Sequence, residues 1–491
     1  MDAVVHAPEI DRPGLAWFNA PTPLALRSLR GKLVILDFWT YCCINCMHVL
    51  PALRRLEESF PEELVVIGIH SPKFSAERDA ENLKRAIARY DIRHPVVNDP
   101  GMTLWRQYGV RAWPTLVFIS PEGRILGHAP GEPDPERLLA AVGQALAEQR
   151  AAGTLSPSAL RLAPPEAPAG RFAFPSKIKP LKAPADGARW ALADAGHHQI
   201  VLLDDGGAEI KRLGSGRPGL ADGVAARAAF NGPQGLVCGT DAIYVADTGN
   251  HAIRRIDLES GEVATLAGNG RRGPVLGAAT PGPDQALASV WDLELAGERL
   301  CFANAGTHQL GQYDLERATV RALAGTGGED IVDGPADQAL LAQPSGLALS
   351  PDGRQLAFAD SETSSVRVLA LDGAGEVRTV VGAGLFDFGH VNGALAQARL
   401  QHALGLAWLD PSRLIVADSY NNALRLIDLA AGQIGDFDDG SYLCTDPVCL
   451  PLGEPAGVWA EGRDRVLLAD TNNHRVLEYR GAEKRYRTWA S

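Results

Sequence analysis

The chain has 491 residues, of which 46% are hydrophobic and 22% charged, and its net charge is −12. This composition indicates a folded protein with a large core rather than a disordered chain. Its mean hydropathy of −0.07 and its short apolar runs predict no membrane-spanning helix.

The charge is divided unevenly along the chain. Residues 1–150 carry 17 Lys and Arg against 18 Asp and Glu, whereas the remaining residues carry 30 against 41. A surface that acidic disfavours nucleic acid and anionic membranes as partners of the C-terminal part. We expect neither as a partner.

Residues 1–150 alternate apolar strands with amphipathic helices, which predicts a small α/β domain with a mixed sheet. The sequence Pro121-Glu122-Gly123 predicts a turn between two antiparallel strands. Strands are expected at 33–38, 64–69, 115–119 and 124–128, and helices at 43–59, 76–90 and 134–149.

Residues 151–169 contain prolines among alanines and serines, which predicts a semi-rigid linker. Beyond it, residues 170–491 consist of short strand patterns and turns. One pattern occurs six times in this part, each time around an acidic or amide residue. These anchors are Asp194, Asp247, Asn304, Asp360, Asp418 and Asp470, spaced 53, 57, 56, 58 and 52 residues apart. Such a period accommodates four strands, so the sequence predicts a six-bladed β-propeller.

The repeated pattern has a physical interpretation. An Asp or Asn at the end of a strand is expected to accept hydrogen bonds from backbone N–H groups two or three residues later. The recurring histidine after it, such as His251, is expected to hydrogen-bond at an equivalent place in each blade. Because these residues recur around the ring, a structural role is favoured over a metal-binding or catalytic one.

This pattern resembles NHL repeats, and the resemblance covers roughly residues 170–491. It implies a fold that serves some proteins as an RNA-binding surface, others as a protein-interaction platform, and others as a metal-dependent lyase. The acidic charge argues against RNA, and the metal ligands of the lyases cannot be matched here. We therefore expect this propeller to bind a protein or peptide partner.

Three of the seven cysteines, Cys42, Cys43 and Cys46, lie within five residues of one another. A predicted strand ends just before them, and Cys43 and Cys46 form a Cys-x-x-Cys that opens a predicted helix. The positive end of a helix dipole and its free N–H groups stabilise a thiolate, and a second thiol one turn later resolves a mixed disulfide. Cys43 is therefore the predicted nucleophile and Cys46 the predicted resolving thiol.

The cluster resembles the thioredoxin superfamily over residues 20–150, and in particular its redoxin branch with the TlpA/ResA-like proteins. The resemblance implies that Asp37 is a buried acid that helps to deprotonate Cys46. It also implies that Pro114 is a cis-proline beside the two sulfurs, and that Trp39, Trp113 and Thr115 contact the substrate.

Departures from that family leave alternatives open. Ile44 and Asn45 replace the usual Gly-Pro, so the direction of the redox reaction is undetermined. Cys42 stands where a tryptophan is common. It is a small buried hydrophobe, a third thiol that takes part in exchange, or, with Cys46 and His48, a copper ligand as in Sco-type chaperones.

A peroxidase is a minor alternative. Thr40-Tyr-Cys-Cys43 fits the Thr-x-x-Cys of peroxiredoxins, but Leu36 stands where their upstream proline would fall. No cofactor and no metal site are expected.

The other cysteines have weaker claims to chemistry. Cys238 and Cys301 are expected in the propeller core, and Cys444 and Cys449 are expected to be a reduced pair in a loop. The first twenty residues show no basic start followed by an apolar stretch, so a cytoplasmic location is expected.

The combination of both parts, with Cys42-Cys-Ile-Asn-Cys46, resembles the NHL repeat-containing protein 2 family. Our first hypothesis is a thiol–disulfide oxidoreductase whose propeller binds a protein or peptide substrate. The alternative is a non-catalytic interaction scaffold in which the thioredoxin-like module is degenerate. The substrate, the electron donor and the oligomeric state are left open by the sequence.

Overall fold

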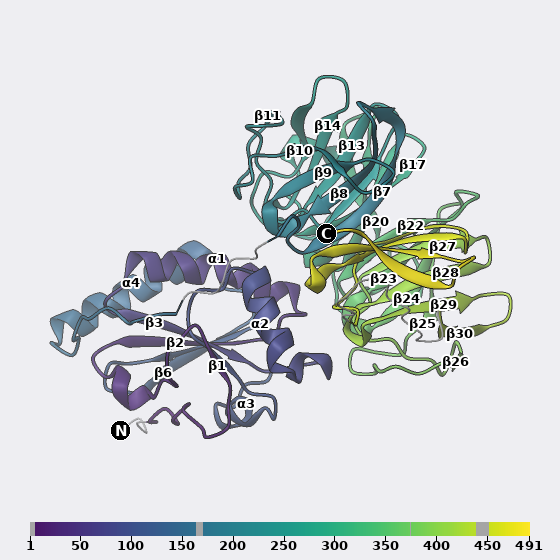
Figure 1. Ribbon diagram of the computed structural model, residues 1–491. Helices are drawn as coiled ribbons and strands as arrows, with labels where there is room; N and C mark the ends of the chain where they lie inside the picture. Colours follow the sequence, from purple (N-terminus) through teal and green to yellow (C-terminus); the bar gives the residue numbers. More distant parts are fainter. Residues whose placement is uncertain (1–4, 164–169, 374, 438–450) are drawn as a thin grey trace. The chain divides into compact units, whose positions relative to one another are not determined.

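The computed structural model describes residues 5–163, 170–373, 375–437 and 451–491. The chain divides into two compact units, Met1–Ala167 and Pro168–Ser491 (Figure 1). Within the described ranges no helix is both long enough and apolar enough to span a membrane. The predicted Cys444 and Cys449 pair lies outside the described residues.

Unit 1 is a mixed six-stranded sheet in the order β1-β4-β3-β2-β5-β6. Its strands are β1 (Trp17–Phe18), β2 (Leu33–Trp39), β3 (Leu64–His70), β4 (Val96–Asn98), β5 (Thr115–Ile119) and β6 (Ile125–Pro130). Its helices are α1 (Ile44–Ser59), α2 (Ala80–Arg89), α3 (Thr103–Gln107) and α4 (Pro135–Ala151), with short 3-10 turns η1 (Leu26–Leu29) and η2 (Ala76–Arg78). This is the predicted thioredoxin-like α/β fold.

Every residue of the central strand β2 is buried, because the sheet is covered on both faces (Figure 1). Ile35 packs with apolar residues of α1 and α4, whereas Leu36 packs with Leu104 of α3 on the other face. Side chains alternate along a strand. Asp37 and Trp39 therefore point to the face that α1 covers.

The helix expected at 76–90 is interrupted. Asp79 has an extended backbone, and its carboxylate accepts hydrogen bonds from the N–H groups of Glu81 and Asn82, which makes it the N-cap of α2. The residues before it form only the turn η2. The single predicted helix is therefore wrong at its start.

The linker expected at 151–169 is also wrong in its first part. Helix α4 runs to Ala151, and the segment after it is hydrogen-bonded to unit 1: Ser156 N–H donates to Gly31, and Ser158 N–H donates to Glu62. Leu160 packs against the unit 1 core. Leu155 and Leu160 therefore hold this part of the predicted linker against unit 1.

Unit 2 is a six-bladed propeller, as the repeats predict. Blade one contains β7 (Pro175–Ala185), β8 (Ala188–Asp194), β9 (Gln199–Leu203) and β10 (Glu209–Leu213). Blade two contains β12 (Gly235–Cys238), β13 (Ala242–Asp247), β14 (Ala252–Asp257) and β15 (Glu262–Ala267). Blade three contains β17 (Val290–Ala296), β18 (Arg299–Asn304), β19 (Gln309–Asp314) and β20 (Thr319–Ala324).

Blade four contains β22 (Pro344–Leu349), β23 (Gln355–Asp360), β24 (Ser365–Ala370) and β25 (Glu376–Val381). Blade five contains β27 (Gly405–Asp410), β28 (Arg413–Asp418), β29 (Ala423–Asp428) and β30 (Gln433–Asp436). Blade six contains β31 (Val458–Glu461), β32 (Arg465–Asp470), β33 (Arg475–Arg480) and β34 (Arg485–Ala490). Two-residue strands β11 (Gly223–Val224), β16 (Thr280–Pro281), β21 (Gly334–Pro335) and β26 (Gly393–Ala394) add an outer edge to blades two to five.

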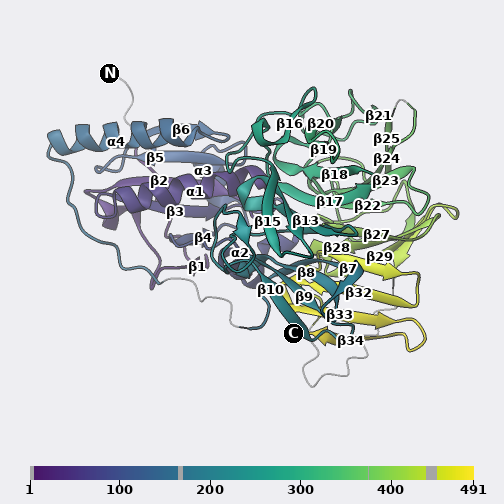
Figure 2. The same ribbon diagram turned by 90° about the horizontal axis from the view of Figure 1, so that it is seen from above.

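Each blade is built from consecutive strands, so the ring closes without a strand shared between its two ends. Blade six lies beside blade one (Figure 2). The Thr471 hydroxyl donates to the Pro175 carbonyl, and Trp190 packs edge-on against Trp459. Side-chain contacts therefore join the last blade to the first and close the ring.

The anchor residues do not bond as the sequence suggested. Instead of accepting N–H groups two or three residues later, each accepts a backbone N–H that lies 16 to 21 residues earlier, at 2.7–2.9 Å. The reason is that the residues after each anchor already form a 3-10 turn, so the side-chain oxygen of the anchor faces the loop that enters the same blade. The turns are η3 (Ala195–His197), η4 (Thr248–Asn250), η6 (Ala305–Thr307), η7 (Ser361–Thr363), η8 (Ser419–Asn421) and η9 (Thr471–Asn473).

The expected hydrogen bond of the recurring histidine is confirmed. The residue that follows each turn has a φ of 50–56°, in the left-handed region, and its side chain accepts a backbone N–H of the next blade at 2.8–3.1 Å. These residues are His198, His251, His308, Ser364, Asn422 and His474. The last bond, from Phe174 N–H to His474, joins blade six to blade one.

Buried ion pairs connect the anchors to the third strands. Arg254, Arg367 and Arg425 are fully buried and donate to Asp247, Asp360 and Asp418 at 2.7–2.9 Å. Burial raises the pKa of Asp247 to about 6, and Arg254 opposes that rise.

Two ion pairs, Lys177–Asp292 and Lys179–Glu294, join the innermost strands of blades one and three. At equivalent positions of the innermost strands, four blades have a glycine; a Cβ on Gly405 would lie 1.8 Å from the Ala456 carbonyl of the next blade. Blades one and three have Lys177 and Asp292 there, and these side chains form a buried ion pair. Asp292 also accepts the Leu347 N–H of blade four at 2.8 Å. Lys177 therefore reaches across the axis.

We expect Lys177→Met to lower the stability of unit 2 by about 3–5 kcal/mol, because it leaves Asp292 buried without its cation. Adding Asp292→Asn should restore most of that loss, since it removes the unpaired charge while its amide oxygen still accepts the Leu347 N–H. Pulse alkylation of the buried Cys238 and Cys301 along a urea series measures unfolding of this unit. Equal stability of the single and double variants would contradict the assignment.

Candidate functional site

Cys43 is the N-cap residue of α1, directly after the loop that leaves β2. Its Sγ accepts the Cys46 N–H at 3.2 Å, and the side chain is partly exposed. A sulfur that accepts a helix N-terminal N–H is stabilised as a thiolate. The structure thus places the predicted nucleophile where such chemistry requires it.

Cys46 lies one turn later and is buried. Burial, the hydrogen bond between the two thiols and the neighbouring charges of Cys43 and Asp37 raise the pKa of Cys46 well above its ordinary value. Cys46 therefore keeps its proton in the reduced protein and needs a base before it attacks a disulfide.

Asp37 is the acid that faces this thiol. It lies in β2 and is fully buried, and neither carboxyl oxygen has a hydrogen-bond partner among the described residues. Burial raises the pKa of Asp37 to about 7, and the charge of His94 opposes the rise. Asp37 therefore exchanges its proton near neutral pH, as a proton carrier must.

The loop before β5 leads into the strand that pairs with β2, with Thr115 opposite Phe38. The Trp113–Pro114 peptide bond is cis, which confirms that part of the expectation for Pro114. The Trp113 indole donates to the Ser71 carbonyl at 2.9 Å. The backbone N–H and C=O of Trp113 form no hydrogen bond with the described residues, so they are available to an extended peptide.

Two of the three predicted substrate contacts do not fit the structure. Trp39 is 0% exposed, with its ring against His70 beneath the site. The Thr115 side chain is also buried and donates to the Ala112 carbonyl at 2.7 Å. Side-chain contact with a substrate is therefore left to Trp113; the other two support the site from below.

Glu77 has a role that no motif in the sequence indicates. It is fully buried, and its carboxylate accepts the Thr40 hydroxyl at 2.7 Å and the Cys42 N–H at 2.9 Å. It also accepts the N–H groups of Lys73 and Phe74 at 2.8–2.9 Å. Through these hydrogen bonds, Glu77 holds in place the loop that leads to Cys43. Recognising Asp79 as an N-cap would have removed Glu77 from the expected helix and indicated a separate role.

Cys42 is buried, and its thiol lies 3.9 Å from the Thr40 hydroxyl. This fits the interpretation of a small buried hydrophobe. His48 pairs instead with Glu132, at 3.1 Å. In the described part of the chain, no three His, Cys, Asp or Glu side chains are grouped so that they could hold a metal ion. The structure therefore offers no set of ligands for the copper-binding alternative.

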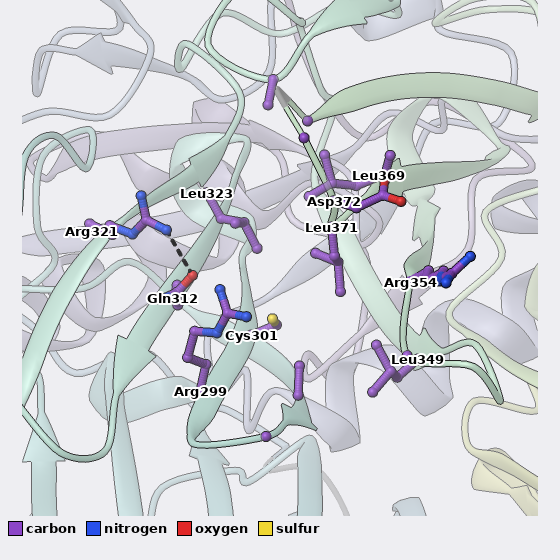
Figure 3. Close-up of a pocket in the computed structure, with 17 residues that line it drawn as sticks. Arg299, Cys301, Gln312, Arg321, Leu323, Leu349, Arg354, Leu369, Leu371 and Asp372 are labelled. Carbon is purple, nitrogen blue, oxygen red and sulfur yellow. Dashed lines mark hydrogen bonds between the residues drawn. The ribbon is translucent and has the colours of Figure 1, made fainter.

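Unit 2 contains a cleft of about 440 Å³ between blades three and four (Figure 3). Arg299 and Arg321 lie on its blade-three side, where Arg321 donates to Gln312 at 3.1 Å, and Arg354 lies on the blade-four side. Leucines, among them Leu349, form its apolar wall. Cys238 and Cys301 are buried in strands, as expected, and burial raises their pKa to about 12, so they remain protonated.

Comparison with known proteins agrees with both units. A thioredoxin-like family model matches residues 31–125. NHL repeat-containing protein 2 of Gallus gallus is 37% identical over 96% of this chain and 69% of its own length. Protein SUPPRESSOR OF QUENCHING 1, chloroplastic, of Arabidopsis thaliana is 38% identical over 94% of this chain and 45% of its own length.

A shorter similarity concerns a redox protein. Thiol-disulfide oxidoreductase ResA of Halalkalibacterium halodurans is 29% identical over 106 residues, which are 21% of this chain and 56% of that protein. Unit 1 is therefore related to thiol–disulfide oxidoreductases. The chain spans less than half of the plant relative, so activities of that whole protein are not transferred.

The titration of Asp37 predicts how the stability of unit 1 depends on pH. The folded state holds this proton up to about pH 7, whereas the unfolded chain releases it near 3.8. Stability is therefore fully present below that lower value and falls as the pH rises through about 7, by about 4 kcal/mol. Asp37→Asn should abolish this fall, as measured by native-state hydrogen exchange of β2 amides between pH 4 and pH 8. Parallel pH profiles of the two proteins would contradict it.

Proposed function

The chain belongs to the NHL repeat-containing protein 2 family, and we propose that it is a thiol–disulfide oxidoreductase whose propeller binds a protein or peptide substrate. The observation that carries the proposal is the juxtaposition of three groups. Cys43 is partly exposed at a helix N-terminus, Cys46 is buried behind it, and the unpartnered carboxyl of Asp37 lies below.

The proposed reaction has two steps. The Cys43 thiolate attacks one sulfur of a substrate disulfide, which forms a mixed disulfide and releases the other sulfur as a thiolate. Cys46 then gives its proton to Asp37 and attacks Cys43. A Cys43–Cys46 disulfide forms, the second substrate sulfur leaves, and the two electrons of the protein dithiol have passed to the substrate. The reverse sequence oxidises a substrate dithiol.

Observations on Thr40 disfavour the peroxidase alternative. Its hydroxyl donates to Glu77 and is fully buried, so it does not face a peroxide at Cys43. The scaffold alternative rests on the replacement of Gly-Pro by Ile44 and Asn45. Absence of exchange by the dithiol would favour it.

The proposed location is the cytoplasm. Seven cysteines in a chain of 491 residues are not the pattern of a disulfide-stapled secreted protein. Fractionation of cells that express a tagged chain tests this location.

Cys46→Ser should trap substrates. Without the resolving thiol, the mixed disulfide on Cys43 accumulates, and mass spectrometry after acid quenching should find it. Cys43→Ser should trap nothing, and Cys42→Ser should still cycle because that thiol is buried beside Thr40. A wild-type protein that reduces no insulin, together with an empty Cys46→Ser trap, would contradict the proposal.

We further propose that the cleft of Figure 3 binds the partner. The guanidinium groups of Arg299 and Arg354 form no ion pair among the described residues, in a unit whose charge is otherwise strongly acidic. Three arginines beside an apolar wall suit a peptide in which Asp or Glu neighbours an aliphatic residue.

Replacing Arg299 by Glu should weaken binding of such a peptide about tenfold or more, because a charge-assisted hydrogen bond becomes a repulsion. Fluorescence anisotropy of labelled peptides of this kind, titrated with each variant, measures the affinity. Arg227→Glu makes the same charge change at an exposed arginine outside the cleft and should have no effect. Equal affinities of the two variants for the peptide would mean that the peptide binds outside the cleft.

A further inference from the structure

Beneath the first turns of α1, several polar atoms are buried without a hydrogen-bond partner among the described residues. They include both carboxyl oxygens of Asp37, the indole nitrogen of Trp39 and Nε2 of His94. An unsatisfied buried polar group costs about 1–3 kcal/mol. Such a concentration next to a dithiol requires an explanation beyond stability.

Gly68 brings these groups together. It is the register partner of Asp37 in the parallel pair β2 and β3, so a side chain there would point to the same face as the Asp37 carboxyl. A Cβ on Gly68 would lie 2.8 Å from Trp39 Nε1 and 3.3 Å from His94 Nε2. The imidazole edge of His94 therefore occupies the space next to Asp37 that a larger residue at position 68 would fill.

The other side of His94 leads toward water. Its Nδ1 lies 3.5 Å from the carboxylate of Glu57 on α1, whose side chain is 25% exposed. The Asn19 amide donates to the His94 carbonyl at 3.0 Å and holds this loop in place. One ring nitrogen thus faces the buried acid, and the other faces a carboxylate that reaches solvent.

On the basis of the proposed oxidoreductase function, we propose that His94 is a positioning residue that passes the proton of the resolving step between Asp37 and Glu57. Asp37 takes the proton from Cys46 as the sulfur–sulfur bond to Cys43 forms. His94 then receives it at Nε2 and releases one from Nδ1 to Glu57, which gives it to water. The electrons move only between sulfurs. In the oxidising direction the same groups carry a proton inward.

The surrounding charges agree with this relay. Cys46 on α1 and His94 in the loop before β4 are the titratable groups that interact with Asp37, and the charge that His94 carries once it holds the proton opposes the rise in the pKa of Asp37. The second buried histidine, His70, is different. It is held by Asn98 at 3.1 Å, and burial lowers its pKa to about 4, so it stays neutral. His70 is therefore a matched control for a buried imidazole.

The test uses the full chain, first reduced and then labelled on Cys43 with thionitrobenzoate as a mixed disulfide. Attack by Cys46 releases the thionitrobenzoate, so the rate of release at each pH measures the resolving step. His94→Gln should move the midpoint of the rate profile up by about one pH unit and slow release at pH 7 about tenfold. His70→Gln should leave the midpoint unchanged. In an Asp37→Asn background, His94→Gln should add nothing, because the group it serves is absent.

An unchanged midpoint in His94→Gln, or a further change in the Asp37→Asn background, would overturn the relay. A second readout does not need exchange: the infrared band of the Asp37 carboxyl, identified by its loss in Asp37→Asn, should titrate at higher pH in His94→Gln. If the wild type fails to release thionitrobenzoate, the proposed function fails, and the infrared titration still decides the coupling between His94 and Asp37.

Discussion

A carboxylate that leaves water must gain hydrogen-bond donors or give up its charge, and both units of this protein depend on that constraint. In the propeller, Asp247 receives a backbone N–H, the Asn250 amide and the Arg254 guanidinium. In unit 1, Glu77 receives four donors. Asp37 receives none among the described residues, and burial raises its pKa to about 7.

The two outcomes serve different purposes. A carboxylate with a full set of donors holds distant segments in one geometry, because moving any of them would leave a buried charge without a partner. The blade anchors and Glu77 act in this way. An unpartnered carboxyl gains nothing from remaining charged, so its state follows the pH and its proton is available for transfer. Rigidity and reactivity therefore come from the same residue type in different surroundings.

Blade three meets the same constraint without charged residues. Its anchor is Asn304, and the position of the buried arginine is taken by Gly311. The ring of Phe302 fills the space over that glycine, where a Cβ would lie 2.1 Å from it. Asn304 keeps the backbone N–H of Ala288 and bonds Thr307 at 2.6 Å. Removing the anion and the cation together preserves the fold, since neither charge is left alone in the core.

Features that a sequence pattern encodes directly could be predicted from the residues alone: the six-fold period, the dithiol at a helix start and the proline loop at Pro114. Sequence patterns misplaced the helix start at Asp79, the linker and the anchor bonds, and they indicated neither Glu77 nor His94. Those features depend on which strands lie side by side. Lys177 meets Asp292 across 115 residues, and His94 meets Asp37 through the space above Gly68. Tertiary structure decided them because only the packing of distant segments removes a charged group from water and chooses its partners.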